Sequence, residues 1–273
     1  MGWLYVAPAF VLYAAFLLFP LVRAAQFSLY DWDGLSVGTW AGLANYAEIL
    51  TDETLRAAFG HALVLMVFFA VVPLAIGLLL ASVLNRAQVR GLGFFRTVVF
   101  LPQVVAMVVI AVAWRRIYDP DNGFGPLRGW LGSYDLALPA VGLVGTWFET
   151  GLVTVLLLAG MGRIPRELYE AARLDGAGAV REFGAVTLPS VRGEIAVALT
   201  LTVIAALKTF DLIYVTTKGG PGTSTVVPSY LVYDNAFQKG QVGLAAAIGV
   251  ALTLVIFAIS YVINRIGDKG AGA

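Results

Sequence analysis

The chain has 273 residues, of which 59% are hydrophobic and 13% charged, with a formal net charge of +1. Soluble domains are about half apolar, so this composition predicts an integral membrane protein, and the small net charge gives no field that would attract nucleic acid. Cysteine is absent, which excludes disulfides, thiol nucleophiles and thiolate metal sites. We assign no metal to the one histidine, His61.

Six apolar stretches reach the length of about 20 residues that a helix needs to cross a bilayer core. In chain order they are Trp3–Val22, Phe59–Leu84, Phe94–Trp114, Leu138–Met161, Glu194–Val215 and Val242–Ile263. The first stretch lacks the basic flank and cleavage site of a signal peptide, so we expect it to be a retained helix. The sequence predicts an all-α fold, a polytopic transmembrane bundle of six helices in one domain, residues 1–273.

Basic residues predict the orientation. With a cytoplasmic start, the inner segments are 85–96, 161–193 and 264–273, and the outer segments are 23–58, 115–137 and 217–241. Lys and Arg are about twice as dense in the inner segments, as the positive-inside rule requires. We therefore expect both termini in the cytoplasm.

Pro73 lies near the middle of the second stretch. A proline there frees a backbone carbonyl and kinks the helix, which neighbouring helices can tolerate. The kink serves packing or acts as a hinge, and both interpretations stay open.

Charged residues inside the stretches are costly at membrane depth and face a cavity or a partner. Glu149 lies in the fourth stretch, and Lys208 and Asp211 lie in the fifth. Helical spacing puts three residues of the fifth stretch on one face: Thr202, Ala206 and Thr209. These residues line a translocation path, or Lys208 and a carboxylate form an internal pair near the outer interface.

The glycine-rich run 219–225 does not fit a phosphate-binding loop, because no Gly-Lys-Ser/Thr follows and no strand precedes it. The chain also lacks a nucleophile–base pair with histidine and a cluster of carboxylates. We therefore predict a chain that is not an enzyme, holds no cofactor and hydrolyses no nucleotide itself.

A polar segment, residues 162–193, separates the fourth and fifth stretches. Pro165 suits the first turn of a helix, Arg166 and Glu170 are spaced as an i,i+4 pair, and Gly176 supplies a stop. A second short helix is expected over residues 179–187, ended by Pro189. The segment is mixed in charge and offers a flat face at Ala171 and Ala172, so docking to a protein explains it better than lying on lipid headgroups.

This segment resembles the EAA motif of ATP-binding-cassette importer permeases, through Glu170-Ala171-Ala172, Gly176 and Thr187-Leu188-Pro189. More narrowly, the chain resembles permeases of carbohydrate importers of the maltose and glycerol-3-phosphate type. Further matching stretches run through the chain in order: Tyr30–Gly34, Leu43–Tyr46, Phe210–Tyr214, Thr217–Pro221, Tyr233–Phe237 and Gly243–Ala247.

The resemblance implies a type I importer permease fold in the inner membrane of a prokaryote, moving a sugar, oligosaccharide, polyol or glycerol phosphate by alternating access. The implied partners are a second homologous permease, a cytoplasmic ATPase dimer that binds the ATP, an extracytoplasmic solute-binding protein and the lipid bilayer. The motif assigns docking on the ATPase to seven positions: Glu167, Glu170, Ala171, Ala172, Asp175, Gly176 and Ala177.

Family members that bind sugar in the pore use the helices on either side of the EAA segment. The matching positions here are Gly145, Phe148, Glu149, Leu152, Thr202, Ala206, Lys208 and Thr209. Gly, Leu and Ala stand at positions where maltose-type permeases carry hydrogen-bonding groups, so the sequence leaves open whether this subunit binds sugar or leaves selectivity to the binding protein.

An alternative function is an ion-coupled secondary transporter that uses Glu149, Lys208 or Asp211. Such carriers place the coupling charge near mid-membrane, often at a broken helix. This alternative gives no role to the polar segment 162–193.

Overall fold

The structure is a computed structural model that describes residues 2–86 and 91–269. Residues 87–90 and 270–273, which fall in two of the predicted inner segments, lie outside the described residues. The chain is mostly helical, and its contacts divide it into two compact units. Unit 1 comprises Met1–Gly60 and Val226–Val255, and unit 2 comprises His61–Thr225 and Ile256–Ala273. The single transmembrane domain stays a prediction.

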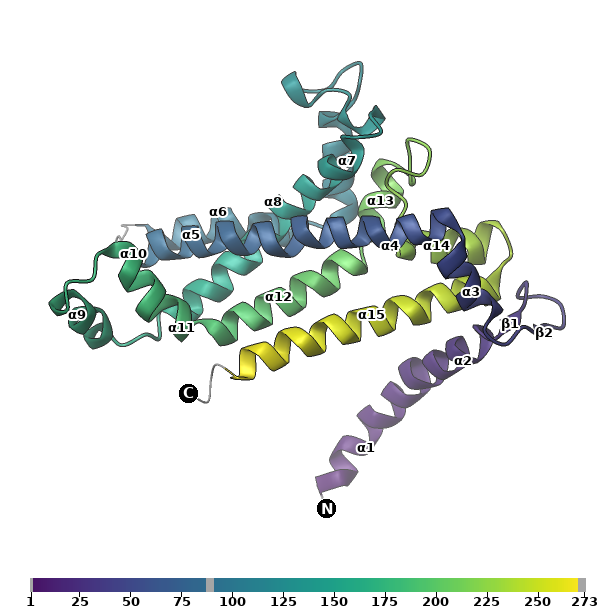
Figure 1. Ribbon diagram of the computed structural model, residues 1–273, viewed down its shortest axis with the longest axis horizontal. Coiled ribbons are helices and arrows are strands. Elements are labelled where there is room, and N and C mark those ends of the chain that lie inside the picture. Colours follow the sequence, from purple (N-terminus) through teal and green to yellow (C-terminus); the bar gives the residue numbers. More distant parts are fainter. Residues whose placement is uncertain (1, 87–90, 270–273) are drawn as a thin grey trace. The chain divides into compact units, whose positions relative to one another are not determined.

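Unit 1 contains short helices and one small hairpin (Figure 1). Its elements are α1 (Gly2–Tyr13), the π-helical turn η1 (Ala14–Leu18), α2 (Phe19–Phe27), β1 (Tyr30–Asp31), β2 (Thr39–Trp40), α3 (Ala44–Thr51), the start of α4 (Glu53–Met66), α14 (Pro228–Tyr233), the π turn η6 (Asp234–Gln238) and the first half of α15 (Val242–Lys269). The strands pair antiparallel, with Tyr30 opposite Trp40.

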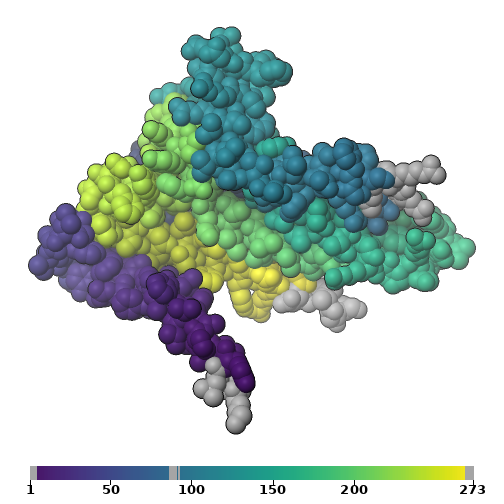
Figure 2. Space-filling view, turned by 180° about the vertical axis from the view of Figure 1, so that it is seen from behind, coloured from purple at the N-terminus to yellow at the C-terminus, as the bar shows by residue number. Residues whose placement is uncertain are grey.

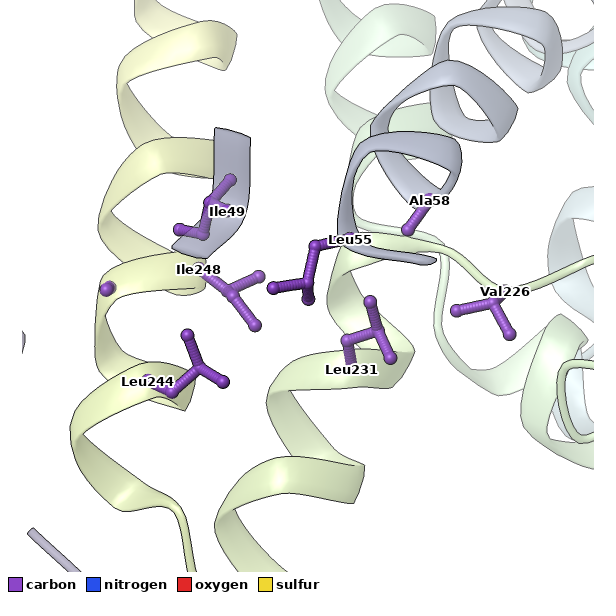
Figure 3. Close-up of a cluster of buried hydrophobic side chains, with 8 residues drawn as sticks. Ile49, Leu55, Ala58, Val226, Leu231, Leu244 and Ile248 are labelled. Atoms are coloured by element: carbon purple, nitrogen blue, oxygen red, sulfur yellow. The ribbon is translucent and has the colours of Figure 1, made fainter. Parts of the chain in front are cut away.

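The core of unit 1 joins residues far apart in sequence. Side chains of α3, α4, α14 and α15 converge on one apolar cluster (Figure 3) that contains Ile49, Leu55, Ala58, Val226, Leu231, Leu244, Ala247 and Ile248. The backbone is tied as well, because the Asn45 amide donates to the carbonyls of Ser28 at 2.9 Å and Tyr30 at 3.0 Å. A Cβ atom on Gly243 would collide with the Tyr30 carbonyl. Three of the stretches that carry the resemblance therefore meet in this unit.

Unit 2 holds the longer helices. Its elements are η2 (π turn Val67–Val71), α5 (Val72–Arg86), α6 (Leu92–Val104), α7 (Met107–Ile117), the 3₁₀ turns η3 (Gly125–Leu127) and η4 (Trp130–Gly132), α8 (Ala137–Met161), α9 (Arg166–Leu174), α10 (Ala179–Glu182), η5 (π turn Phe183–Thr187), α11 (Leu188–Ser190), α12 (Arg192–Leu207) and α13 (Asp211–Thr216). Helix α8 lies at the centre of this unit. Most of its residues are buried, and it contacts α5, α6 and α12.

Among the described residues, four helices are long and apolar enough to cross a membrane: Tyr5–Phe27, Glu53–Asn85, Ala137–Met161 and Val242–Gly267. Two bent helix pairs also qualify if each is one span, Gly93–Val104 with Met107–Ile117, and Ala179–Ser190 with Arg192–Leu207. The structure therefore gives four to six spans.

The expectation of a continuous third helix is wrong. Helices α6 and α7 meet at 93°, with extended backbone at Val105. Pro102 lies three residues before the break and removes a backbone donor from the last turn of α6, which weakens that turn. This proline is the signal that the sequence analysis overlooked.

The predicted fifth helix is not continuous, because it breaks at residues 208–210. Helix α12 ends at Leu207, Lys208 follows it, and α13 begins at Asp211. A carboxylate in the first turn stabilises a helix start through the backbone dipole, so Asp211 favours a new helix over continuation of α12.

Three prolines inside long helical segments are each preceded by a π-helical turn. A π turn ends two residues before each of them: η1 before Pro20, η2 before Pro73 and η5 before Pro189. In each case the residue before the proline donates its N–H to the carbonyl five residues back, as Val72 does to Val67. The wider turn keeps the proline ring from the carbonyl of the preceding turn, with which it would clash in an α-helix.

The turn before Pro73 leaves the Phe68 carbonyl without the N–H that residue 73 would supply. The Thr146 hydroxyl of α8 donates to this carbonyl at 2.6 Å. Gly142 and Gly145 precede Thr146 on α8 and let this helix approach closely, because a Cβ on either would overlap Phe68 or Phe69. The Pro73 turn is thus a packing feature built around α8.

We predict that Thr146→Val lowers the midpoint of thermal unfolding in nanodiscs, by the equivalent of about 1 kcal/mol, because a buried carbonyl loses its donor. Thr146→Ser keeps the hydroxyl and is the matched control. In a Pro73→Ala background the amide of residue 73 can donate to the Phe68 carbonyl. Thr146→Val should then lower the unfolding midpoint by less than it does in the parent chain. Equal losses in both backgrounds would contradict this account.

Candidate functional site

The polar segment leaves the end of α8 through a tight turn. Gly162 donates its N–H to Leu158 at 3.0 Å, and Arg163 donates to Gly160 at 3.0 Å. Pro165 has ψ 136° and caps α9, so it stands just before the first helical residue, Arg166, rather than in the first turn as expected.

The end of α9 is fixed by two hydrogen bonds around Gly176. Ala177 donates to the Ala172 carbonyl at 2.9 Å, and Gly176 donates to the Arg173 carbonyl at 3.0 Å. This pattern is a Schellman motif, which needs a left-handed residue after the helix. Gly176 has φ 75°, a value that favours glycine. The predicted stop at Gly176 is therefore confirmed.

The predicted docking residues lie on the outside of this motif. Glu167, Glu170, Ala171, Asp175 and Gly176 are exposed, and Ala172 and Ala177 are half-buried. Two large apolar side chains stand beside them, Leu174 at 89% exposed and Val180 at 87% exposed. Exposed apolar groups on a polar loop mark an interaction surface. The sequence analysis missed Leu174.

The second helix of the segment is longer than predicted. Residues 179–190 are helical throughout α10, η5 and α11, so Pro189 does not end the helix. The chain then bends by 70° into α12. In the space-filling view, the green-teal residues of this segment form one edge of unit 2 (Figure 2).

Two side-chain contacts join α9 to this second helix. Arg173 Nε donates to Glu182 Oε2 at 3.1 Å, and the hydroxyls of Tyr169 and Thr187 are 3.1 Å apart. Among the described residues, the ion pair of this segment joins Arg173 to Glu182 rather than Arg166 to Glu170. A pocket of about 400 Å³, lined by Asn85, Met161, Arg166, Tyr169, Glu170 and Glu182 among others, lies beside α9.

Glu149 is buried within the chain, at 3% exposed. Gln103 of α6 donates to the Phe148 carbonyl at 3.0 Å and to Glu149 Oε2 at 3.4 Å. Gln103 lies two residues before the break between α6 and α7, so this contact fastens the broken span to α8. The sequence analysis missed Gln103, the one amide side chain in that stretch.

The other predicted path residues do not form one helical face. Thr202 and Ala206 are buried on α12, and Thr202 donates back to the Ala198 carbonyl at 2.9 Å. Thr209 lies beyond the end of α12, so its predicted place on the same helix is wrong. Lys208 and Asp211 are exposed at this break, Phe148 and Leu152 are half-buried on α8, and Gly145 packs on Phe69. Their role in a path stays a prediction.

Comparison with known proteins decides the family. The model described as "Binding-protein-dependent transport system inner membrane component" matches residues 73–271, which include α8, α9 and α12. The chain belongs to this family. It is therefore a multi-pass inner-membrane component of a transport system. This family membership does not support the alternative of an ion-coupled secondary transporter.

Curated relatives extend the match over nearly the whole chain. A probable ABC transporter permease of Bacillus subtilis is 35% identical, with 94% of this chain and 92% of that protein aligned. The diacetylchitobiose uptake system permease of Streptomyces coelicolor is 33% identical over 96% of this chain and 81% of its own length. The trehalose/maltose transport system permease of Thermococcus litoralis is 31% identical over 98% and 93%.

A solved structure shares the fold. A chain of a bacterial ABC transporter involved in the import of the acidic polysaccharide alginate superposes with a TM-score of 0.80 at 23% identity, covering 98% of this chain and 96% of that one. The fold is therefore that of an ABC importer permease.

We predict that Gly176→Ala loosens the end of α9, because an alanine at this positive φ is strained by about 1–2 kcal/mol. Gly178→Ala is the matched control. Neither glycine has an atom near the position of a new Cβ, and Gly178 has φ −74°, an ordinary value. Hydrogen exchange of the Gly176 and Ala177 amides should quicken in the first variant alone. Equal protection in both variants would show that the positive φ does not hold the motif.

Proposed function

We propose that the chain is the permease subunit of an ATP-driven carbohydrate importer, and that α9 docks on a separate cytoplasmic ATPase. The observation that carries this proposal is the exposed surface of α9 and the turn after it. Five of the seven EAA positions face solvent there, next to exposed Leu174 and Val180. A membrane subunit without a nucleotide site needs a contact through which hydrolysis elsewhere acts on it.

The substrate class follows from the relatives. Two proteins that align over most of this chain are named for trehalose/maltose and diacetylchitobiose. A third, the multiple sugar-binding transport system permease of Streptococcus mutans, is 30% identical over 98% of this chain. These names support a mono- or oligosaccharide as the solute, moved by alternating access.

The proposed assembly contains a second homologous permease, an ATPase dimer and an extracytoplasmic solute-binding protein. The family description itself names dependence on a binding protein. A related alginate transporter, at 22% identity, was crystallised with a substrate-bound periplasmic protein. In this arrangement α9 and both termini face the cytoplasm, as the density of basic residues predicts.

We assign the walls of the solute path to α8 and α12, which contact each other in unit 2. Phe148 and Leu152 offer half-buried apolar surface on α8. The buried Glu149 carboxylate is held by Gln103, so it contributes to the path only if the contact between α6 and α8 opens. This burial favours selectivity by the binding protein.

The test is reconstitution of this chain with its second permease, ATPase and binding protein in proteoliposomes. Glu170→Lys combined with Gly176→Asp should abolish uptake of labelled maltose, trehalose or chitobiose. The same double substitution should abolish the stimulation of ATP hydrolysis that the loaded binding protein causes. Asp121→Lys, which makes the same charge change as Glu170→Lys at an exposed loop site, should leave both unchanged. Uptake that needs no ATP and survives the double substitution would overturn the proposal.

A further inference from the structure

A tight turn joins the N-terminal end of α9 to α8, whereas the backbone connection of α9 toward α12 is short and rich in glycine. Its C-terminal link is Gly176-Ala177-Gly178, and glycine has the greatest backbone freedom. Beside the helix lies the pocket of about 400 Å³, so α9 does not pack tightly on the ends of α5 and α8. A force on α9 would be absorbed by this link unless side chains carry it.

Two side chains of α9 supply such a connection. Tyr169 and Arg173 are four residues apart and share one face of the helix. Tyr169 reaches Thr187 at 3.1 Å, and Arg173 reaches Glu182 at 3.1 Å. The opposite face, with Glu167, Glu170 and Leu174, stays exposed.

The second helix of the segment, residues 179–190, places Glu182 and Thr187 on one side because of its π turn. Residues five apart on an α-helix point about 140° away from each other. Glu182 and Thr187 are five apart, but the turn Phe183–Thr187 is π-helical, and its wider winding brings residues five apart closer to the same side of the helix. The irregular turn before Pro189 therefore positions both contacts.

The partners on this helix are firmly held. The Glu182 side chain is 5% exposed and that of Arg173 is 63% exposed, so the carboxylate is anchored and the guanidinium reaches it from solvent. Thr187 is also buried. Four residues beyond Thr187, Val191 enters the core of unit 2 beside Leu157, Leu158 and Ala198, which belong to α8 and α12.

We propose that Arg173–Glu182 and Tyr169–Thr187 form a brace that makes α9 and residues 179–190 move as one rigid lever. Through these two contacts, a displacement of α9 is transmitted directly to residues 179–190, without relying on the glycine link, and from there to the core shared by α8 and α12. Arg173 and Glu182 are positioning residues, since neither has to touch solute or nucleotide. The role of the brace in transport rests on the proposed docking of α9.

The first test measures rigidity directly and needs no partner. Spin labels on Leu174→Cys and Val180→Cys, both exposed sites in a chain without cysteine, report the distance between the two helices in nanodiscs. We expect a narrow distribution for the parent chain and a broad one for Glu182→Gln and Arg173→Ala. Arg181→Ala, an exposed arginine next to Glu182, is the matched control and should stay narrow. Unchanged widths in the brace variants would overturn the proposal.

The second test measures coupling in the full reconstituted importer. We expect Glu182→Gln and Arg173→Ala to assemble with the ATPase but to raise the ATP hydrolysed per sugar transported, by about threefold or more. Tyr169→Phe removes only the hydroxyl and should give a smaller rise. The exchange of Arg173→Glu with Glu182→Arg should recover part of the coupling, which a general loss of folding would not allow.

The outcomes separate the two proposals. If the parent complex shows no ATP-dependent uptake, the proposed function fails. If the parent complex transports and the brace variants keep its ATP-to-sugar ratio, the brace alone fails. A raised ratio with no recovery in the exchanged pair also overturns the brace, because pairing of the two charges would not be its cause.

Discussion

Backbone polar groups inside a membrane must find partners within the protein, and this constraint governs the local structure of the chain. Each of three prolines would leave a carbonyl unpaired and crowded in a regular helix, and each is preceded by a π turn. Where the turn leaves the Phe68 carbonyl free, α8 brings the Thr146 hydroxyl to it. The close approach this needs explains why α8 carries glycines at positions 142 and 145.

The water-facing segment uses the same π turn before a proline. Near Pro189, the π turn does more than accommodate a missing N–H, because it aligns Glu182 and Thr187 toward α9. Side chains therefore strengthen the connection of α9 to residues 179–190, which the backbone makes only through Gly176-Ala177-Gly178. Under the proposed function, this attachment would pass motion from an ATPase docked on α9 to the membrane helices.

Much of the site could be predicted from the sequence, because its signals are local. Pro165 and Gly176 mark the two ends of α9, and the exposed EAA positions follow from helical geometry between them. The breaks at Val105 and Lys208 were not predicted, although Pro102 precedes the first and Asp211 follows the second. Hydropathy averaged over about 20 residues does not change when one backbone donor is missing or one carboxylate is present. The expected face of Thr202, Ala206 and Thr209 failed with the second break.

The sequence by itself determined the membrane class, the family and the place of helix α9, since composition, apolar length and a short motif are properties of neighbouring residues. Only the tertiary structure decided which polar groups meet. Gln103 and Glu149 are 46 residues apart, and Thr146 and Phe68 are 78 apart. Such contacts depend on how helices pack, and burial leaves a polar atom only the partners that packing supplies. The shared orientation of Glu182 and Thr187 toward α9 depends in addition on the π turn before Pro189.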